Sequence, residues 1–413
     1  MFDIKGAVKN LDYTGSNGAD TLVLKGALSN STINMGQGAN TLIAENAKGA
    51  GQAITNTAIK SYGSTSILAG KYTAGATGNT IDLGVGAHSV TLASITATRG
   101  VRATVKMDVA GSDDQSLTVK GAVSNLDYTG SNGADTLTLS GALSNSTINL
   151  GGGANALTAK NAKGVGQAVT NTGITSNGST TIEAGKYTAG ATGNTIDLGA
   201  GSHSVTLASI AAAKGLLATV KMDVAGSQAQ SLAVKGAVTY ASISAGNGKG
   251  TVSAGSMTNS TLTMGNDSGL VSRTIDIAGN MASSTVKAGG GGTAMTVGGS
   301  VKNSAVEAGK GDNSLAIGKA ASGLTYKGSS QKDDVSVKGS LSASTLDLGD
   351  GTNSVTVATL GKTGGLVGQT ISDTTITATG AASTSITAGK YLSGKTGSQI
   401  TFGTGVNSLR LMG

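Results

Sequence analysis

The residues that could carry acid–base or metal chemistry are few in this chain. There are two histidines, His88 and His203, and no cysteine. Because the histidines occupy equivalent places of an internal repeat, we expect them to lie too far apart for one zinc site or one catalytic triad. Two adjacent carboxylate pairs, Asp113-Asp114 and Asp333-Asp334, are the remaining candidates for general acid–base catalysis.

These carboxylate pairs are the basis for a hypothesis of polysaccharide cleavage, since parallel β-helices include enzymes of that class. The first pair is replaced by Gln228-Ala229 in the second copy of the repeat. Aromatic residues, which would stack on sugar rings, make up 2% of the chain. An isolated acidic pair is more typical of a solvated turn. We therefore predict that the protein is not an enzyme, and a β-helical polysaccharide-active enzyme is the third hypothesis.

A glycine-rich turn, a polar residue and an apolar alternation recur throughout the chain, first at residues 36–44. The polar residue is asparagine in five of the copies, at Asn40, Asn155, Asn313, Asn353 and Asn407. Asparagine tolerates left-handed backbone geometry, and its side chain readily hydrogen-bonds nearby backbone groups. We predict that these side chains bond their own turn or the adjacent coil and form a structural ladder.

Two of the turns carry aspartate instead, in the identical octads 15–22 and 130–137. The octad resembles the glycine- and aspartate-rich nonapeptide of RTX proteins, which form calcium-bound β-rolls, and the repeats of bacterial surface-adhesin β-solenoids. This resemblance implies that Asp20 and Asp135 are Ca²⁺ ligands. Ser16 stands where the family has its second glycine, and asparagine largely replaces aspartate elsewhere. Calcium prefers several anionic oxygens, so we expect most coils to need no cofactor.

Internal repeats organise the whole chain. Residues 1–120 hold a first module and residues 121–235 a near-identical copy, offset by 115 residues. Residues 236–327 are irregular short repeats, and residues 328–413 resume the module in part. Glycine clusters recur about every 20 residues, the length expected of one coil. We interpret the four segments as one continuous solenoid, in which each coil is stabilised by its neighbours.

Within a coil, polar and apolar residues alternate with period two, as in the segment 147–150. Two short strands and two glycine turns would fill a coil, and the coils would stack in parallel about 4.8 Å apart. The predicted fold is all-β: a right-handed parallel β-solenoid of about 20 coils. Its inward columns are predicted to include Ile33, Met35, Leu42, Ile148, Leu150, Leu157, Leu346, Leu348 and Val355.

Composition restricts the possible partners. The chain has 413 residues, 67 glycines, no proline and a net charge of +7. Its abundant β-branched residues are not typical of a disordered glycine-rich chain. The lysines are scattered singly without aromatic residues between them, which predicts no nucleic-acid binding and a weaker attraction to anionic polysaccharide. No run of about 18 apolar residues exists, so no membrane span is predicted.

Both sequence ends resemble the middle of a repeat, since residues 2–8 match 117–123 and residues 407–411 match 203–207. Open solenoid ends expose unpaired backbone groups. The predicted assembly contacts are therefore Phe2 and Ile4 at one end and Leu409 and Leu411 at the other, pairing head to tail with further copies of the chain.

Three tyrosines in Gly-Lys-Tyr triplets, Tyr72, Tyr187 and Tyr391, either pack on the coil or make lateral contacts between molecules. The resulting functional hypothesis is a structural extracellular protein of the bacterial cell surface, which assembles end to end into fibres, a surface layer or a biofilm matrix. The alternative is a repeat segment of a large secreted adhesin that binds glycans.

Overall fold

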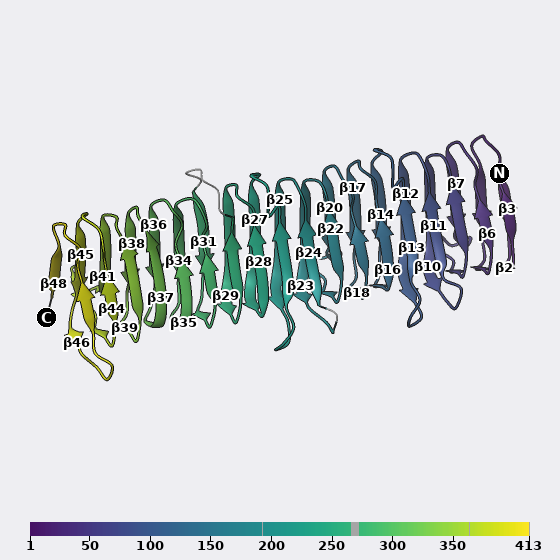
Figure 1. Cartoon of the computed structure of the whole chain (residues 1–413). Helices are drawn as coiled ribbons and strands as arrows, with labels where there is room; N and C mark the ends of the chain where they lie inside the picture. Colours follow the sequence, from purple (N-terminus) through teal and green to yellow (C-terminus); the bar gives the residue numbers. More distant parts are fainter. Residues whose placement is uncertain (192, 266–271, 363, 413) are drawn as a thin grey trace. The chain divides into compact units, whose positions relative to one another are not determined.

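The computed structural model describes residues 1–191, 193–265, 272–362 and 364–412. Over these ranges the chain forms 48 β-strands and no helix (Figure 1). They make up two compact units, Met1–Ala208 (unit 1) and Ser209–Gly413 (unit 2), whose boundary lies inside the second sequence module. In each unit parallel strands stack coil upon coil, which confirms the predicted parallel β-solenoid. The described part of the chain contains no helix that could cross a membrane.

Each described coil contributes to three ladders of strands, not two as the alternation predicted, either with three separate strands or with one long strand that spans two ladders. In unit 1, for example, β4 (Thr21–Leu24) is followed by the short strands β5 (Leu28–Ser29) and β6 (Thr32–Asn34). Asn30 separates β5 from β6 with a φ of 49°, in the left-handed region that asparagine tolerates. The prediction was wrong because this single residue makes a corner of its own, displacing the inward positions by one residue without any glycine.

A buried hydroxyl stabilises this corner. Behind Asn30, the Ser31 hydroxyl donates to the carbonyl of Ser29 at 2.8 Å and accepts the N–H of Leu11 in the previous coil at 2.9 Å. The same corner is built on Asn10, Asn56, Asn125, Asn145, Asn171, Asn259 and Asn303. The buried hydroxyl recurs at Thr57, Ser146, Thr172, Ser260, Ser284, Ser304, Ser344 and Thr374. The repeated Asn-Ser or Asn-Thr pair is the sequence signal that would have revealed the third strand.

Three ladders of strands therefore run through unit 1. The first ladder contains β1 (Phe2–Ile4), β4, β7 (Asn40–Ala44), β10 (Thr65–Ala74), β12 (His88–Ala97), β14 (Gln115–Val119), β17 (Asp135–Leu139), β20 (Asn155–Ala159), β23 (Thr180–Thr188) and β25 (His203–Ala211), whose last residues belong to unit 2. The second contains β2 (Val8–Lys9), β5, β8 (Ile54–Thr55), β15 (Val123–Ser124), β18 (Leu143–Ser144), β21 (Val169–Thr170) and the ends of β10, β12 and β23. The third contains β3 (Asp12–Thr14), β6, β9 (Ala58–Ser61), β11 (Asn79–Leu83), β13 (Ala103–Met107), β16 (Leu126–Thr129), β19 (Thr147–Asn149), β22 (Gly173–Ser176) and β24 (Asn194–Leu198).

Unit 2 repeats the arrangement. Its first ladder contains β27 (Gln230–Thr239), β29 (Gly250–Thr258), β31 (Arg273–Ile277), β34 (Thr293–Val297), β36 (Asn313–Ile317), β38 (Asp333–Val337), β41 (Asn353–Leu360), β45 (Thr384–Ala388) and β48 (Ser408–Leu411). The second contains the ends of β27 and β29, β32 (Met281–Ala282), β39 (Leu341–Ser342), β43 (Ile371–Ser372) and β46 (Tyr391–Leu392). The third contains β26 (Ala218–Met222), β28 (Ala241–Ala245), β30 (Thr261–Met264), β33 (Thr285–Lys287), β40 (Thr345–Gly349), β44 (Thr375–Thr377) and β47 (Gln399–Thr401). β35 (Val301–Glu307) and β37 (Ala321–Ser329) run through both of these ladders, and β42 (Leu366–Gly368) forms a hairpin with the end of β41.

Coil length varies because loops are inserted at the corners. Successive first-ladder strands of unit 1 are offset by 20, 25, 23 and 27 residues, at the pairs Leu22/Leu42, Asn40/Thr65, Thr65/His88 and His88/Gln115. The longer coils carry loops at residues 45–53, 75–78 and 98–102. The two units therefore contain about 17 turns between them, fewer than the 20 or so expected from a uniform coil.

The core consists of aligned columns of side chains, one residue from each coil. All nine residues predicted to face inward are fully buried. In the first ladder Leu22 stacks on Leu42, and in the third ladder Tyr128 stacks between Val105 and Ile148. Each fully buried aliphatic side chain contributes about 1.5–3 kcal/mol of transfer free energy. Since only a neighbouring coil provides that burial, a coil at the end of a stack is held less firmly than an interior one.

Candidate functional site

The five predicted asparagines stand at the start of first-ladder strands and bind the backbone of two coils. The side-chain carbonyl of Asn40 accepts the N–H of Asp20, one coil earlier, at 3.0 Å. Its amide donates to the carbonyls of Gly36 and Gln37 in its own turn at 3.3 and 3.0 Å. Equivalent bonds are made by Asn155, Asn313, Asn353 and Asn407. These bonds form the structural ladder that the sequence predicted.

The glycines of these turns are required by close contact between coils. Gly36 has a φ of 75°, and a Cβ there would lie 2.0 Å from the carbonyl oxygen of Ser16. At Gly151, with a φ of 69°, the corresponding distance to Ser131 is 1.7 Å. The turns therefore lie almost directly upon one another. Their backbone groups face the next coil and the side chains of the ladder, which leaves little of the turn open to a ligand.

Asp20 and Asp135, the candidate calcium ligands, bond their own turns. Asp20 accepts the N–H and hydroxyl of Ser16 at 2.6 and 3.0 Å. Asp135 accepts the N–H and hydroxyl of Ser131 at 2.7 and 3.0 Å. Asp20 is partly exposed, whereas Asp135 is fully buried between the coils of Gln115 and Asn155. Both carboxylates are thus engaged within their own turns, and no group of three or more acidic, histidine or cysteine side chains gathers as a metal site in the described ranges.

Burial changes the protonation of Asp135. Removal from water, with a smaller contribution from the negative charge of Asp114, raises the pKa of this carboxyl to about 6, against the lowering effect of the hydrogen bonds from Ser131 and from the backbone of Gln115. The group therefore titrates near neutral pH. This property results from the interior position of Asp135, since burial is the largest cause of the shift.

His88 occupies the same ladder position as the asparagines. Its Nε2 lies 2.7 Å from the carbonyl oxygen of Gly84 in its own turn, which assigns the ring proton to Nε2. Burial lowers the pKa of His88, opposed by that carbonyl and by Asp108 and Asp113, so the ring is neutral near pH 7. His203 repeats the contact with Gly199 at 2.8 Å. The histidines are thus structural substitutes for asparagine, in separate coils.

The paired carboxylates do not form acid–base pairs. Asp333 is fully buried and accepts the hydroxyl of Tyr326 at 2.6 Å, while its neighbour Asp334 lies on the outer face of β38. Asp113 and Asp114 are exposed turn residues, and Asp114 accepts the N–H of Ala134 at 2.9 Å. Alternation along β38 separates Asp333 and Asp334 onto opposite faces of the sheet, and in the other pair Asp114 is bonded to the next coil.

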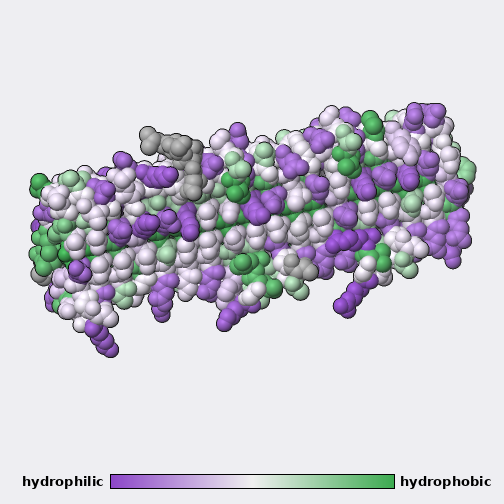
Figure 2. All heavy atoms as spheres, in the orientation of Figure 1, coloured by the Kyte–Doolittle hydropathy of each residue, from purple (hydrophilic) through white to green (hydrophobic). Residues whose placement is uncertain are grey.

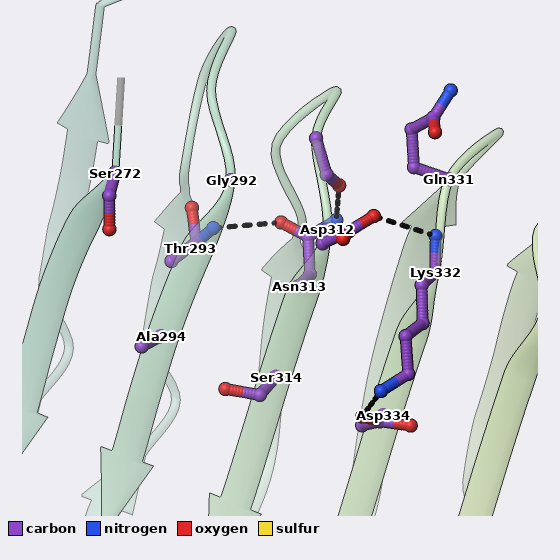
Figure 3. A pocket seen from close by; sticks show the side chains of 11 residues that line it. Ser272, Gly292, Thr293, Ala294, Asp312, Asn313, Ser314, Gln331, Lys332 and Asp334 are labelled. Atoms are coloured by element: carbon purple, nitrogen blue, oxygen red, sulfur yellow. Dashed lines mark hydrogen bonds and ion pairs between the residues drawn. The ribbon is translucent and has the colours of Figure 1, made fainter. Parts of the chain in front are cut away.

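A groove of about 620 Å³ crosses the turns of β34, β36 and β38 in unit 2 (Figure 3). Its charged residues are Asp312, Lys332 and Asp334. The Lys332 Nζ lies 2.6 Å from Asp334 Oδ2, and this ion pair raises the pKa of the lysine. Asp312 accepts the N–H of Lys332 at 3.3 Å. Within this groove, Lys332 is thus paired with Asp334, and Asp312 is bonded to the backbone of the next coil.

The tyrosines predicted for lateral contacts lie elsewhere. Tyr72 and Tyr187 are fully buried in the second ladder, where they pair with Ile54 and Val169. They cannot contact a neighbouring molecule, so the lateral hypothesis is wrong for both. Tyr391 is half-exposed in β46 and remains a candidate. The triplets mislead because in coils with a continuous long strand the lysine faces outward and the tyrosine faces the core.

The predicted assembly residues lie on exposed strands. In β1, Phe2 is 52% exposed and pairs with the buried Leu22, and Ile4 pairs with the buried Leu24. In β48, Leu409 and Leu411 are 45% and 50% exposed and continue the columns of Ile386 and Ala388. In the described structure each of these strands pairs on one side only, β1 with β4 and β48 with β45.

One element of the turn ladder escaped sequence reasoning. Arg273 is fully buried at a position that asparagine fills elsewhere, and its guanidinium donates to the carbonyls of Ala288 and Asn247, each at 3.0 Å. The residue at this position one coil earlier is Gly250, and the end of the Met264 side chain lies against that glycine. A lone arginine in a strand-like run carries no sequence signal of such burial.

Comparison with protein-family profiles, with curated proteins and with solved structures found no match to this chain.

Proposed function

We propose that this protein is a non-catalytic structural component of the bacterial cell surface or extracellular matrix, related to RTX-like and adhesin β-solenoids. It acts by joining coils end to end. The observation that carries the proposal is the state of β1 and β48, each of which exposes the apolar column that is buried in neighbouring coils. Exposed strand edges with apolar side chains are templates for pairing with a further strand. The further coil would come from another copy of the chain.

Head-to-tail pairing of this kind is a heterologous contact, which does not close and therefore generates a filament. The described residues support this reading over catalysis, since the carboxylate pairs and histidines are engaged in structural bonds. The Ca²⁺ sites implied by the RTX resemblance are not required for it, because Asp20 and Asp135 already bond their own turns.

The backbone shows which substitution tests the assembly. The carbonyl of Ile4 accepts the N–H of Lys25 at 2.8 Å, so proline at position 4 would break the pairing of β1 with β4. In a parallel ladder alternate residues bond to opposite neighbours, so Asp3 directs its N–H to the open side. Asp3→Pro should therefore prevent filament growth at this end while leaving the coil folded.

The experiment is negative-stain microscopy and sedimentation of the purified chain over a range of concentrations. We expect filaments from the wild type and none from Asp3→Pro. Asp3→Ala is the matched control, because it also removes the ion pair with Lys25 but keeps the N–H. Circular dichroism confirms that each variant retains its β-structure. A wild-type chain that stays monomeric at high concentration would refute the proposal.

A further inference from the structure

Charge is distributed unevenly around the coils of unit 1. Six lysines lie where the first ladder turns into the second: Lys5, Lys25, Lys71, Lys120, Lys160 and Lys186. Four of them are exposed, and Lys25 and Lys160 are partly exposed. We call this corner the basic edge. In Figure 1 the second ladder, with β2 and β18, follows the lower border of unit 1, and hydrophilic side chains project from that border in Figure 2.

Loops beside the basic edge add further positive charge. Lys48 and Lys163 are exposed at equivalent places of the loops that join β7 to β8 and β20 to β21. Arg99 is exposed on the other side of the second ladder, in the loop 98–102 that joins β12 to β13. Acidic residues near the edge are Glu45 and two that are already paired, Asp3 with Lys25 and Glu183 with Lys160. The edge therefore carries a clear excess of positive charge.

The other acidic residues of unit 1 lie away from this edge. Four are on or beside outward positions of the third ladder: Asp12, Asp82, Asp127 and Asp197. Five are in or next to the turns that return the chain to the first ladder: Asp20, Asp108, Asp113, Asp114 and Asp135. This separation of charge is a property of the fold, because in the sequence the lysines and aspartates are interspersed.

The surface beside the lysines is polar and hydroxylated. Outward residues of the second ladder include Ser29, Thr55, Ser124, Ser144 and Thr170, all partly exposed. On the strands of this ladder as described, the tyrosines point inward, so the outer face offers no ring on which a nucleic-acid base could stack. Hydroxyl groups between cations are suited to a ligand that presents both hydroxyl and carboxylate oxygens.

A polar groove of about 430 Å³ borders the second ladder on its other side. It is lined by the corner asparagines Asn125, Asn145 and Asn171, together with Thr147 and Arg102. The Arg102 Nη1 donates to the carbonyl of Leu126 at 3.3 Å and to the hydroxyl of Thr147 at 3.2 Å, which holds the guanidinium at the groove. Its remaining N–H groups can bind a carboxylate, which arginine recognises in a planar, forked geometry.

We propose that the basic edge of unit 1 binds a linear acidic polysaccharide that lies along the stack of coils. Coils are about 4.8 Å apart, so lysines one or two coils apart present positive charges about 5–10 Å apart. A chain of uronic acid residues presents carboxylates and hydroxyls in regular succession. The lysines bind the carboxylates as point charges, the serines and threonines bind the hydroxyls, and Arg102 anchors one uronate. This proposal is independent of filament assembly.

The test is the affinity for polygalacturonate, with dextran as a neutral polymer. Lys71→Gln/Lys120→Gln removes two lysines two coils apart on the edge. Lys60→Gln/Lys106→Gln is the matched control, since it removes two lysines two coils apart on the third ladder, where both flank Asp82. We expect the first variant to bind polygalacturonate at least about tenfold more weakly at low salt and the control to bind it like the wild type. The affinity of the first variant should also depend less on salt, since each lost lysine removes one ionic contact.

Three results would overturn the proposal. These are no binding of polygalacturonate by the wild type, equal losses in the two variants, and tighter binding of single-stranded DNA or of anionic phospholipid vesicles. Equal losses would show that net charge alone drives the attraction, and the last result would assign the edge to another class of polyanion. Repeating the measurement in Asp3→Pro and Asp3→Ala separates this binding from filament formation, since both variants release Lys25 from its ion pair and only the proline blocks the open side of β1.

Discussion

The octads 15–22 and 130–137 are identical in sequence, yet the structure gives them different environments. In each octad a serine N–H and hydroxyl bond the aspartate four residues later. Asp135 is fully buried between two coils, whereas Asp20 has a coil on one side and is partly exposed. Tyr128 is fully buried between Val105 and Ile148, but its counterpart Tyr13 pairs with Ile33 alone and is partly exposed.

The difference shows that local sequence sets the geometry of a turn, while the neighbouring coil sets its dielectric environment. Bonds within a turn are satisfied by residues a few positions apart, so they are copied with the sequence. Burial depends on residues 20 or more positions away, such as Gln115 for Asp135. The same side chains therefore contribute differently to stability and to pH dependence in the two copies.

The largest expected effect concerns the tyrosines. Tyr128→Ala should lower the free energy of unfolding by about 3–5 kcal/mol, because it leaves a cavity in a closed column. Tyr13→Ala should lower it far less, since that ring is partly in water and its nearest aromatic contact is Phe2, with ring centroids 6.0 Å apart. Denaturant unfolding followed by circular dichroism measures both variants. Equal losses would mean that the end coil is as well packed as the interior.

The second prediction uses the pH dependence of Asp135. Its folded pKa of about 6 exceeds the ordinary value of 3.8, so the ionised form costs stability above pH 6 and this cost disappears as the pH falls toward 4. Asp135→Asn should therefore stabilise the protein by about 1–3 kcal/mol at neutral pH and have no effect near pH 4. Thermal unfolding at several pH values provides the measurement.

Asp20→Asn is the control for that experiment, because the partly exposed carboxylate of Asp20 keeps contact with water. It should change stability little at either pH. Asparagine fits the position, since Asn313 accepts the N–H of Gly309 in the same way, at 3.1 Å. A destabilised Asp135→Asn variant at neutral pH would show that the charge itself is needed, as the calcium hypothesis requires.

Asparagines of the ladder should respond alike in the two modules. Asn40 and Asn155 are both buried and make the same bonds to the preceding coil and to their own turns. Replacing either by alanine leaves buried backbone groups without partners and should cost about 1–3 kcal/mol. Unfolding experiments on the two single variants test this equality. A much smaller cost at Asn40 would show that the looser packing near β1 also weakens the hydrogen bonds of β7, two coils away.

The smallest expected effect is that of calcium. Because both octad carboxylates already accept an N–H and an O–H from their turns, Ca²⁺ or a chelator should leave the melting temperature unchanged. Differential scanning calorimetry with and without the ion is the measurement. A calcium-dependent shift that Asp20→Asn abolishes would show that the exposed octad retains calcium chemistry and that burial has removed it from Asp135.

Several features of this protein follow from its sequence alone. Alternation with period two, glycine-rich turns and the 115-residue duplication predict stacked parallel strands, and residues such as Ile148 and Leu150 are buried as expected. The asparagine ladder is equally predictable, because each side chain bonds a turn only two to four residues away. These features depend on local periodicity and local hydrogen bonding, which a single repeat already contains.

Other features are decided only by the stacking of coils. The third strand depends on a left-handed asparagine corner, and the variable coil length depends on where loops are inserted. The inward direction of Tyr72, the burial of Arg273 beside Gly250 and the grouping of lysines on one edge all result from the register between coils. Each arises from residues 20 or more positions apart in sequence. Stacking brings such residues within about 5 Å of one another, and these contacts determine the solvent exposure and the electrostatic surroundings of each side chain.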